Sequence, residues 1–295
     1  MSDANILAIR PLSYAIGAEV TGVDLTKPPG SEVIERILDI WNDHHVLLFR
    51  GNQLSPHEIV AFAGSFGALD NHDSTPFYRL DDVHELMQIT NKTMDGKPSE
   101  TRNTGRNWHS DYSYTSRPAA ASMLYCGERP SVGGDTMFCN MVSAYADLSD
   151  GMKNLVRDLE AVYDLSLTAG ISERDPEKTA ELRRLNPPIA HPAVRTHPRS
   201  QKQALYVSER VSHFNGFTRE ESQPLIKQLC AFATRPENVY RHQWQVGDLI
   251  MWDNRTSMHM ALADFDQSEP RYMLRATLLG EPSGTVVNSA TSQYA

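Results

Sequence analysis

Short apolar runs, each closed by turn residues, limit the fold of this chain more than any other feature. Val46–Phe49 ends at Arg50-Gly51, Thr136–Asn140 follows the turn-forming stretch 130–134, and Tyr272–Leu279 lies near the C-terminus. Short apolar runs bounded by glycine and proline are typical of buried strands. Helical and strand-like segments do not alternate as they do in a parallel α/β sheet. The pattern predicts a mainly β fold, a sandwich or barrel with helical additions.

Two capping boxes indicate where helices begin. Ser55 and Glu58 flank Pro56, and Thr218 with Glu221 repeats the pattern. Such pairs satisfy free backbone N–H groups at a helix N-terminus. No repeat or long linker interrupts the chain, so residues 1–295 are predicted to form a single domain. The other predicted segments are helices capped by Ser31, beginning at Ser149 and following Ser172, and a loop over residues 70–118.

Charge and composition exclude several kinds of partner. The 295 residues include 28 Lys and Arg against 37 Asp and Glu, a net charge of −9. Phosphate binding needs a basic surface, so nucleic acid is not expected as a partner. No segment approaches the roughly 18 apolar residues of a membrane span, and no signal peptide is visible. Cys126, Cys139 and Cys230 are too widely spaced for a disulfide framework, so we expect a cytoplasmic protein.

Trp108-His109-Ser110-Asp111 is the local feature with the clearest chemical meaning. Residues two apart in an extended segment point to the same side, so His109 and Asp111 can offer ligand atoms to one metal. His259 follows shortly after the predicted strand Asp248–Asp253. Two histidines and a carboxylate form the facial triad of non-haem Fe(II) oxygenases. His-x-Asp also occurs by chance, and single histidines are often ordinary core or surface residues, so spacing alone leaves both interpretations open.

Arg271 and Arg275 lie at the last predicted strand. If this segment is extended, the two arginines share one face, whereas Tyr272, Leu274 and Ala276 form an apolar face. Two inward guanidinium groups would need anionic partners, because an unpaired buried charge is very costly. Carboxylates and sulfonates suit the planar fork of arginine. The alternative is that both arginines point to solvent or pair with carboxylates of the protein.

Several segments resemble one enzyme family in their order and spacing. They are IGAEVTGVDL at 16–25, the WHSD segment, GGDT at 133–136, HPAVRTHP at 191–198, WDNR at 252–255, His259 and RAT at 275–277. In these segments the chain resembles the TauD/TfdA family of Fe(II)- and 2-oxoglutarate-dependent dioxygenases over nearly its whole length. The resemblance implies a double-stranded β-helix, or jelly roll, with helical additions.

The resemblance also assigns roles to individual residues. His109, Asp111 and His259 match the iron ligands of the family. Thr136 matches a residue whose hydroxyl contacts 2-oxoglutarate, and Arg271 matches the arginine that binds the distal carboxylate of 2-oxoglutarate.

The residues expected at the substrate match less closely. Arg275 resembles the arginine that holds the sulfonate in the taurine enzyme, and His72 resembles a histidine at the same group. A surface position for His72 is the competing interpretation. Tyr112 replaces a smaller residue beside the substrate, which argues against taurine itself. Trp252 and Asn254 are interpreted as structural, Trp252 as a packing residue and Asn254 as part of the turn before His259.

The resemblance implies an enzyme that uses Fe(II), 2-oxoglutarate and O2 to hydroxylate a C–H bond, with release of succinate and CO2. The expected substrate is a small anion, a sulfonate or a carboxylate such as an aryloxyalkanoate. Hydroxylation next to a heteroatom would give an unstable product that splits. Plain hydroxylation without cleavage, or desaturation, competes with it as the reaction at this site. A non-catalytic jelly-roll protein that holds a metal and binds an anionic metabolite is the alternative from another class. A homo-oligomer is compatible with these expectations, and neither membrane nor nucleic acid is an expected partner.

Overall fold

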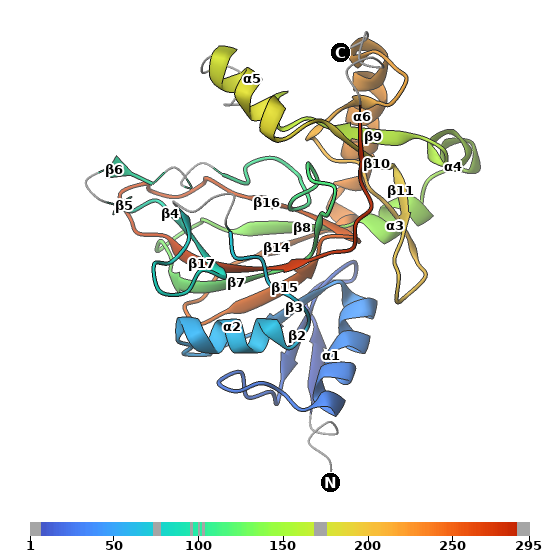
Figure 1. The fold of residues 1–295 in the computed structure, drawn as a ribbon. Helices are drawn as coiled ribbons and strands as arrows, with labels where there is room; N and C mark the ends of the chain where they lie inside the picture. Colours follow the sequence, from blue (N-terminus) through green and yellow to red (C-terminus); the bar gives the residue numbers. More distant parts are fainter. Residues whose placement is uncertain are drawn as a thin grey trace.

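The computed structural model describes residues 7–72, 78–94, 97–99, 101, 104–167 and 176–287, and its centre is a seven-stranded sheet (Figure 1). All neighbouring strands of this large sheet are antiparallel except β2 and β3. The strands, in spatial order, are β1 (Ala8–Pro11), β2 (Ala18–Thr21), β3 (Val46–Phe49), β15 (Leu249–Asp253), β7 (Ala119–Glu128), β17 (Tyr272–Leu279) and β4 (Leu86–Thr90).

A second, three-stranded sheet lies against one face of the large sheet. Its order is β14 (Val239–His242), β8 (Thr136–Asn140) and β16 (Ser257–Ala261). An apolar cluster joins the two sheets, with Phe138 from the small sheet packed among residues such as Leu124, Ile250 and Met273 of the large one. The predicted mainly β architecture is confirmed, and the two layers form the jelly roll that contains the site.

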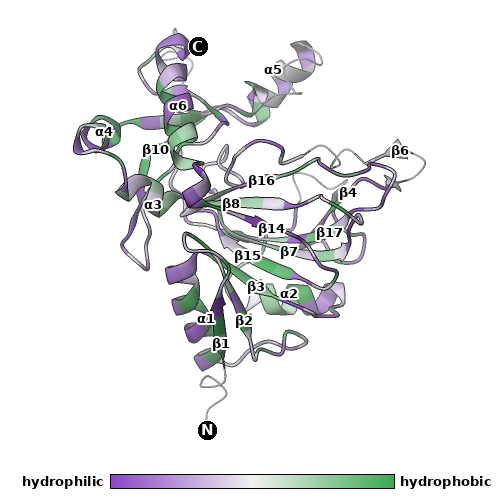
Figure 2. Ribbon diagram, turned by 180° about the vertical axis from the view of Figure 1, so that it is seen from behind, coloured by the Kyte–Doolittle hydropathy of each residue, from purple (hydrophilic) through white to green (hydrophobic). Residues whose placement is uncertain are grey.

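Two helices cover the outer face of the large sheet, α1 (Ser31–His44) and α2 (Pro56–Gly64). One buried apolar cluster contains Ile37 of α1, Phe62 of α2, and Leu274 and Ala276 of β17. In Figure 2 the strands of the large sheet are mostly apolar, whereas α1 carries hydrophilic residues on its outward side. The capping box of Ser55 and Glu58 is confirmed. The predicted cap of α1 is wrong, because Gly30 occupies the N-cap and Ser31 is already helical.

A second group of elements closes the other end of the jelly roll (Figure 1). A third apolar cluster holds it together. Its strands are β9 (Glu160–Tyr163), β10 (Ile189–Pro192), β11 (Val194–Thr196), β12 (Gln203–Leu205), β13 (Val211–Phe214) and β18 (Thr285–Val286). Its helices are α3 (Met141–Ala146), α4 (Asp150–Val156), α5 (Pro176–Leu185), α6 (Arg219–Ala233) and the 3-10 turns Leu165–Leu167 and Pro236–Asn238. The predicted capping box of α6 is confirmed, and Ser172 lies outside the described residues.

The prediction of a loop over residues 70–118 is partly wrong. β4 lies within this stretch, and so do the short pair β5 (Thr93–Met94) and β6 (Lys97–Pro98). β4 pairs along its whole length with β17, so a long-range partner creates a strand that local composition did not indicate. No helix in the described part of the chain is long and apolar enough to cross a membrane.

Candidate metal centre and active site

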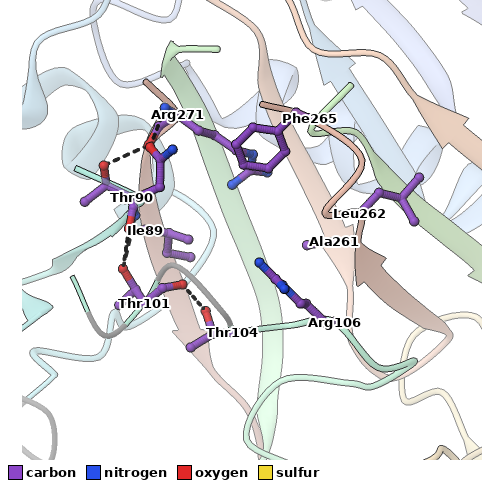
Figure 3. A pocket seen from close by; sticks show the side chains of 10 residues that line it. Ile89, Thr90, Thr101, Thr104, Arg106, Ala261, Leu262, Phe265 and Arg271 are labelled. Atoms are coloured by element: carbon purple, nitrogen blue, oxygen red, sulfur yellow. Dashed lines mark hydrogen bonds between the residues drawn. The ribbon is translucent and has the colours of Figure 1, made fainter. Parts of the chain in front are cut away.

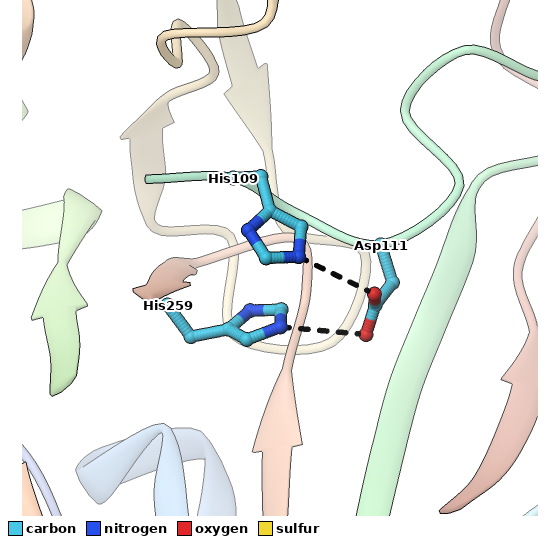
Figure 4. Close-up of side chains that lie close together, drawn as sticks. All are labelled: His109, Asp111 and His259. Atoms are coloured by element: carbon cyan, nitrogen blue, oxygen red, sulfur yellow. Dashed lines mark ion pairs between the residues drawn. The ribbon is translucent and has the colours of Figure 1, made fainter. Parts of the chain in front are cut away.

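His109, Asp111 and His259 come together although the two histidines are far apart in the sequence. The backbone N–H of His109 donates to the carbonyl of His259 at 3.1 Å, and the reverse bond is 2.9 Å. This antiparallel bridge pairs the WHSD segment with β16. One ligand atom from each of the three buried residues lies within 4.8 Å of the others. Figure 4 shows both imidazole rings turned toward the carboxylate.

The protonation of the histidines suits metal binding. Nδ1 of His109 lies 2.7 Å from the carbonyl of Asn107, so Nδ1 carries the proton and Nε2 keeps a free lone pair. Burial lowers the pKa of His109, and the charges of Arg210 and His259 lower it further. Burial likewise lowers the pKa of His259 to about 4. Neutral imidazoles facing a carboxylate are a ligand set suited to a divalent metal, so the residues fit Fe(II).

A hydrogen-bond network fixes the Asp111 carboxylate. The Ser122 hydroxyl donates to Oδ2 of Asp111 at 2.6 Å, and Nδ2 of Asn254 donates to Ser122 at 3.0 Å. Oδ1 of Asn254 accepts the backbone N–H of Asp111 and the indole N–H of Trp252, each at 3.1 Å. Trp252 is buried as predicted, but the interpretation of Asn254 as a turn residue was incomplete. No sequence signal indicated Ser122, because only the folded chain brings β7 beside Asp111.

Replacing Ser122 with alanine is expected to weaken metal binding by roughly 10–100-fold, the usual cost of losing a partner that orients a ligand. The Asp111 carboxylate would lose its shortest hydrogen bond and rotate more freely. Calorimetric titration with Mn(II) measures the change. Ser212→Ala is the matched control, because this buried hydroxyl donates to the carbonyl of Val162. Equal Mn(II) affinity in the two variants would show that Ser122 does not orient the Asp111 carboxylate.

Arg275 lies on the inward face of β17, so the alternative of a solvent-facing side chain is wrong for this residue. Its Nη1 atom donates to Oδ1 of Asp111 at 3.1 Å, so its partner in this structure is a carboxylate of the protein. Burial acts to raise the pKa of Asp111, but the charges of Arg275, His259 and His109 hold that pKa well below its usual value. The carboxylate is therefore ionised and available to a cation. The predicted contact between Arg275 and the substrate stays a prediction.

Arg271 and Thr136, the residues predicted to bind 2-oxoglutarate, lie near the glycine turn before β8. Gly133 and Gly134 have φ values of 77° and 70°, as a tight turn requires. Nε of Arg271 donates to the carbonyl of Gly134 at 3.1 Å. Burial lowers the pKa of Arg271 to about 10, and no carboxylate among the described residues pairs with it. The Thr136 hydroxyl accepts the indole N–H of Trp244 at 3.0 Å.

A cavity opens beside Arg271, and Figure 3 shows the side chains of its walls. Arg106 lines the same cavity, as do Thr90, Thr104 and Ala261, which lies two residues beyond His259 on β16. A buried arginine at the wall of a cavity suits an anionic ligand. Sequence reasoning missed Arg106, since arginines in loops usually point to solvent. The roles of Arg271 and Thr136 toward 2-oxoglutarate stay predictions.

His72 and Tyr112 lie together with Asp70, which the sequence had not indicated. The Tyr112 hydroxyl donates to Oδ2 of Asp70 at 2.8 Å, and Nδ1 of His72 lies 3.0 Å from that hydroxyl. Cζ of Arg275 lies 5.9 Å from the centre of the Tyr112 ring. His72 is fully buried, so the surface interpretation is wrong. Burial and the charge of Arg275 lower the pKa of His72 to about 4.

Comparison with known proteins agrees with this geometry. The model of the Taurine catabolism dioxygenase TauD, TfdA family matches residues 8–277. The alpha-ketoglutarate-dependent 2,4-dichlorophenoxyacetate dioxygenase of Cupriavidus pinatubonensis is 34% identical, covering 92% of this chain and 97% of the relative. The alpha-ketoglutarate-dependent sulfate ester dioxygenase of Pseudomonas putida is 31% identical, covering 93% and 90%.

Two crystal structures have the same fold. AAD-2 in complex with Mn(II) and N-oxalylglycine superposes with a TM-score of 0.82 at 31% identity, covering 94% of this chain and 98% of that one. A taurine dioxygenase from Burkholderia xenovorans superposes with a TM-score of 0.80 at 30% identity, covering 97% and 98%. With its buried facial triad, the chain belongs to the TauD/TfdA family and is a 2-oxoglutarate-dependent non-haem iron dioxygenase.

Proposed function

We propose that this enzyme hydroxylates a C–H bond of a small anionic substrate, a sulfonate or a carboxylate such as an aryloxyalkanoate. One observation carries the proposal: the largely buried Arg275 lies 3.1 Å from Oδ1 of Asp111, a carboxylate that Fe(II) would take as its own ligand. An excess of buried positive charge needs an anion, because an unpaired buried charge is costly. The names of the relatives, a phenoxyacetate and a sulfate ester dioxygenase, refer to substrates of this class.

The residues of the chain divide the work around the metal. His109, Asp111 and His259 hold Fe(II), which with 2-oxoglutarate and O2 supplies C–H oxidation with formation of succinate and CO2. Arg271 and Thr136 bind 2-oxoglutarate. The hydrogen-bonded group of Asp70, His72 and Tyr112 lies beside Arg275, and we place the substrate against it.

The enzyme assignment removes the non-catalytic alternative. Three outcomes compete for the same site: hydroxylation with cleavage, plain hydroxylation and desaturation. Product analysis by mass spectrometry distinguishes them, because the product gains one oxygen, loses two hydrogens or divides into two molecules. A single domain, a cytoplasmic location and a homo-oligomeric state stay predictions, which limited proteolysis, cell fractionation and light scattering test.

A panel of paired compounds tests the charge requirement. Sulfonates, sulfate esters and aryloxyalkanoates are each compared with a neutral amide, ester or alcohol of similar shape, and succinate formation is measured. An acid is expected to stimulate succinate formation most. Its neutral counterpart should lose about 2–5 kcal/mol in kcat/KM, the cost of leaving one member of a buried charge pair alone. If the best substrate is neutral, the proposed substrate class is wrong.

A further inference from the structure

The cavity beside Arg271 is lined by a second arginine, Arg106, and by no acidic residue of the described chain. Ten described residues line it, and the two guanidinium groups are the only charged groups among them. Figure 3 shows the side chain of Arg106 extending toward the same space as that of Arg271. Two cations at one cavity favour an anionic ligand, because like charges repel unless an opposite charge lies between them.

The two arginines differ in depth. Arg271 is buried, and its Nε atom donates to the carbonyl of Gly134 at 3.1 Å, which fixes one side of its guanidinium group. Arg106 is exposed to solvent. The cavity therefore extends from a buried arginine to an exposed one, so an anion that enters from solvent meets the charge of Arg106 first.

Hydrogen bonds on both sides of Arg106 hold its backbone beside the metal ligands. The N–H of Ala261 on β16 donates to the carbonyl of Gly105 at 2.8 Å, and Nδ1 of His109 donates to the carbonyl of Asn107 at 2.7 Å. Gly105 has a φ of 74°, and a Cβ atom there would lie 3.4 Å from Cε1 of His109. The strand and the histidine that form the metal site therefore also set the position of Arg106.

Threonine hydroxyls anchor the turn that precedes Arg106. The Thr104 hydroxyl donates to the carbonyl of Thr101 at 2.9 Å, and the Thr101 hydroxyl donates to the carbonyl of Thr90 at 3.3 Å (Figure 3). The Thr90 hydroxyl in turn donates to the carbonyl of Arg271 at 2.8 Å. A chain of hydrogen bonds therefore links the backbone of Arg271 to the turn that carries Arg106.

The cavity lies beyond the metal site rather than around it. His109, Asp111 and His259 are not among the described residues that line it, whereas Ala261, two residues after His259, is one of them. A ligand that binds the metal at one end would place its other end in this cavity. For 2-oxoglutarate that other end is the distal carboxylate, the group proposed to bind Arg271.

We propose that Arg106 joins Arg271 in holding the distal carboxylate of 2-oxoglutarate and binds it from the exposed side of the cavity. This inference rests on the proposed role of Arg271 in 2-oxoglutarate binding. The buried Arg271 supplies a fixed planar fork, and Arg106 supplies a second charge that covers the carboxylate on the solvent side. Arg106 therefore selects 2-oxo acids that have a second carboxylate over those that have one.

The test compares two ligands that differ only in the distal carboxylate. 2-Oxopentanoate has the chain length and the metal-binding end of 2-oxoglutarate but ends in a methyl group. Calorimetry measures the dissociation constant of each ligand from protein loaded with Mn(II), the metal of the related AAD-2 structure. The variants are Arg106→Gln, Arg106→Lys and the surface control Arg199→Gln, whose guanidinium pairs with Glu35 and Asp39.

The wild-type protein should bind 2-oxoglutarate at least roughly tenfold more tightly than 2-oxopentanoate, because charge-assisted hydrogen bonds are strong. Arg106→Gln should weaken 2-oxoglutarate binding at least roughly fivefold, with unchanged affinity for 2-oxopentanoate and Mn(II). Arg106→Lys should lose less, because it keeps the charge, and Arg199→Gln should bind both ligands as the wild-type protein does. The inference is overturned if Arg106→Gln leaves 2-oxoglutarate binding unchanged, or if it weakens both ligands equally, as a disturbed loop would.

Failure of the proposed role of Arg271 would look different. Equal binding of 2-oxoglutarate and 2-oxopentanoate by the wild-type protein would contradict the roles of both arginines. A preference for 2-oxoglutarate that Arg271→Lys removes and Arg106→Gln retains would contradict only the role of Arg106. The proposed substrate class is tested separately, by the panel of paired compounds.

Discussion

Replacing His109 or His259 with alanine is expected to abolish succinate formation while the fold persists. Each substitution removes one of three metal ligands, and the remaining pair cannot hold Fe(II) in a facial arrangement. We expect a loss of at least roughly a thousandfold, about 4 kcal/mol at 1.4 kcal/mol for each factor of ten. Succinate measured after incubation with Fe(II), 2-oxoglutarate and the best acid of the panel gives the size of the loss.

Thermal unfolding provides the control for the histidine variants. Mn(II) should raise the Tm of the wild-type protein, because a ligand that binds only the folded state stabilises it. Both variants should unfold cooperatively, with little or no increase in Tm on adding Mn(II). His84→Ala, which removes an exposed histidine bonded to the carbonyl of Asp81, should keep the increase and the activity. Full activity in a ligand variant, or in metal-stripped wild-type protein, would refute the metal site.

Replacing Arg271 with lysine is expected to raise the KM for 2-oxoglutarate at least roughly tenfold, about 1.4 kcal/mol. Lysine keeps a positive charge but loses the planar fork and the bond from Nε to the carbonyl of Gly134. Burial already lowers the pKa of Arg271 to about 10, and a lysine in the same surroundings would begin from a lower pKa and hold its proton less firmly. Initial rates of succinate formation over a range of 2-oxoglutarate concentrations measure the effect.

The matched control for Arg271 is Arg129→Lys. Arg129 donates to the carbonyls of Pro130 and Ser131 near the same turn, so the change is equally conservative without reaching the cavity. Its KM for 2-oxoglutarate should equal that of the wild-type protein. The affinity of Arg271→Lys for Mn(II) should also be unchanged. If Arg271→Lys has the same KM for 2-oxoglutarate as the wild-type protein, Arg271 does not bind 2-oxoglutarate as proposed.

Local sequence was sufficient wherever a segment carries its own signal. The apolar runs predicted β3, β8 and β17, and the two capping boxes predicted α2 and α6. The pairing of His109 with Asp111 was also local, because alternation in an extended segment brings residues two apart to one side. The motif order then identified the third ligand and the family.

Tertiary structure decided what depends on partners far away in the chain. β16 carries His259 in the segment Ser257–Ala261, where polar residues interrupt the apolar pattern, and it is a strand because β8 pairs with it. Ser122 and Asn254 meet the ligand Asp111, and Asp70 meets Tyr112, only because the fold brings separate elements together.

The charged residues also separate what the sequence predicts from what the tertiary structure decides. The sequence by itself predicted that Arg271 and Arg275 share a face of the last strand, but not that Asp111 would pair with Arg275. Alternation along a strand is a property of neighbouring residues, so a sequence can specify it. Charge pairing depends on distances between elements, which the packing of sheets and loops sets, and therefore only the folded chain decides which charges pair.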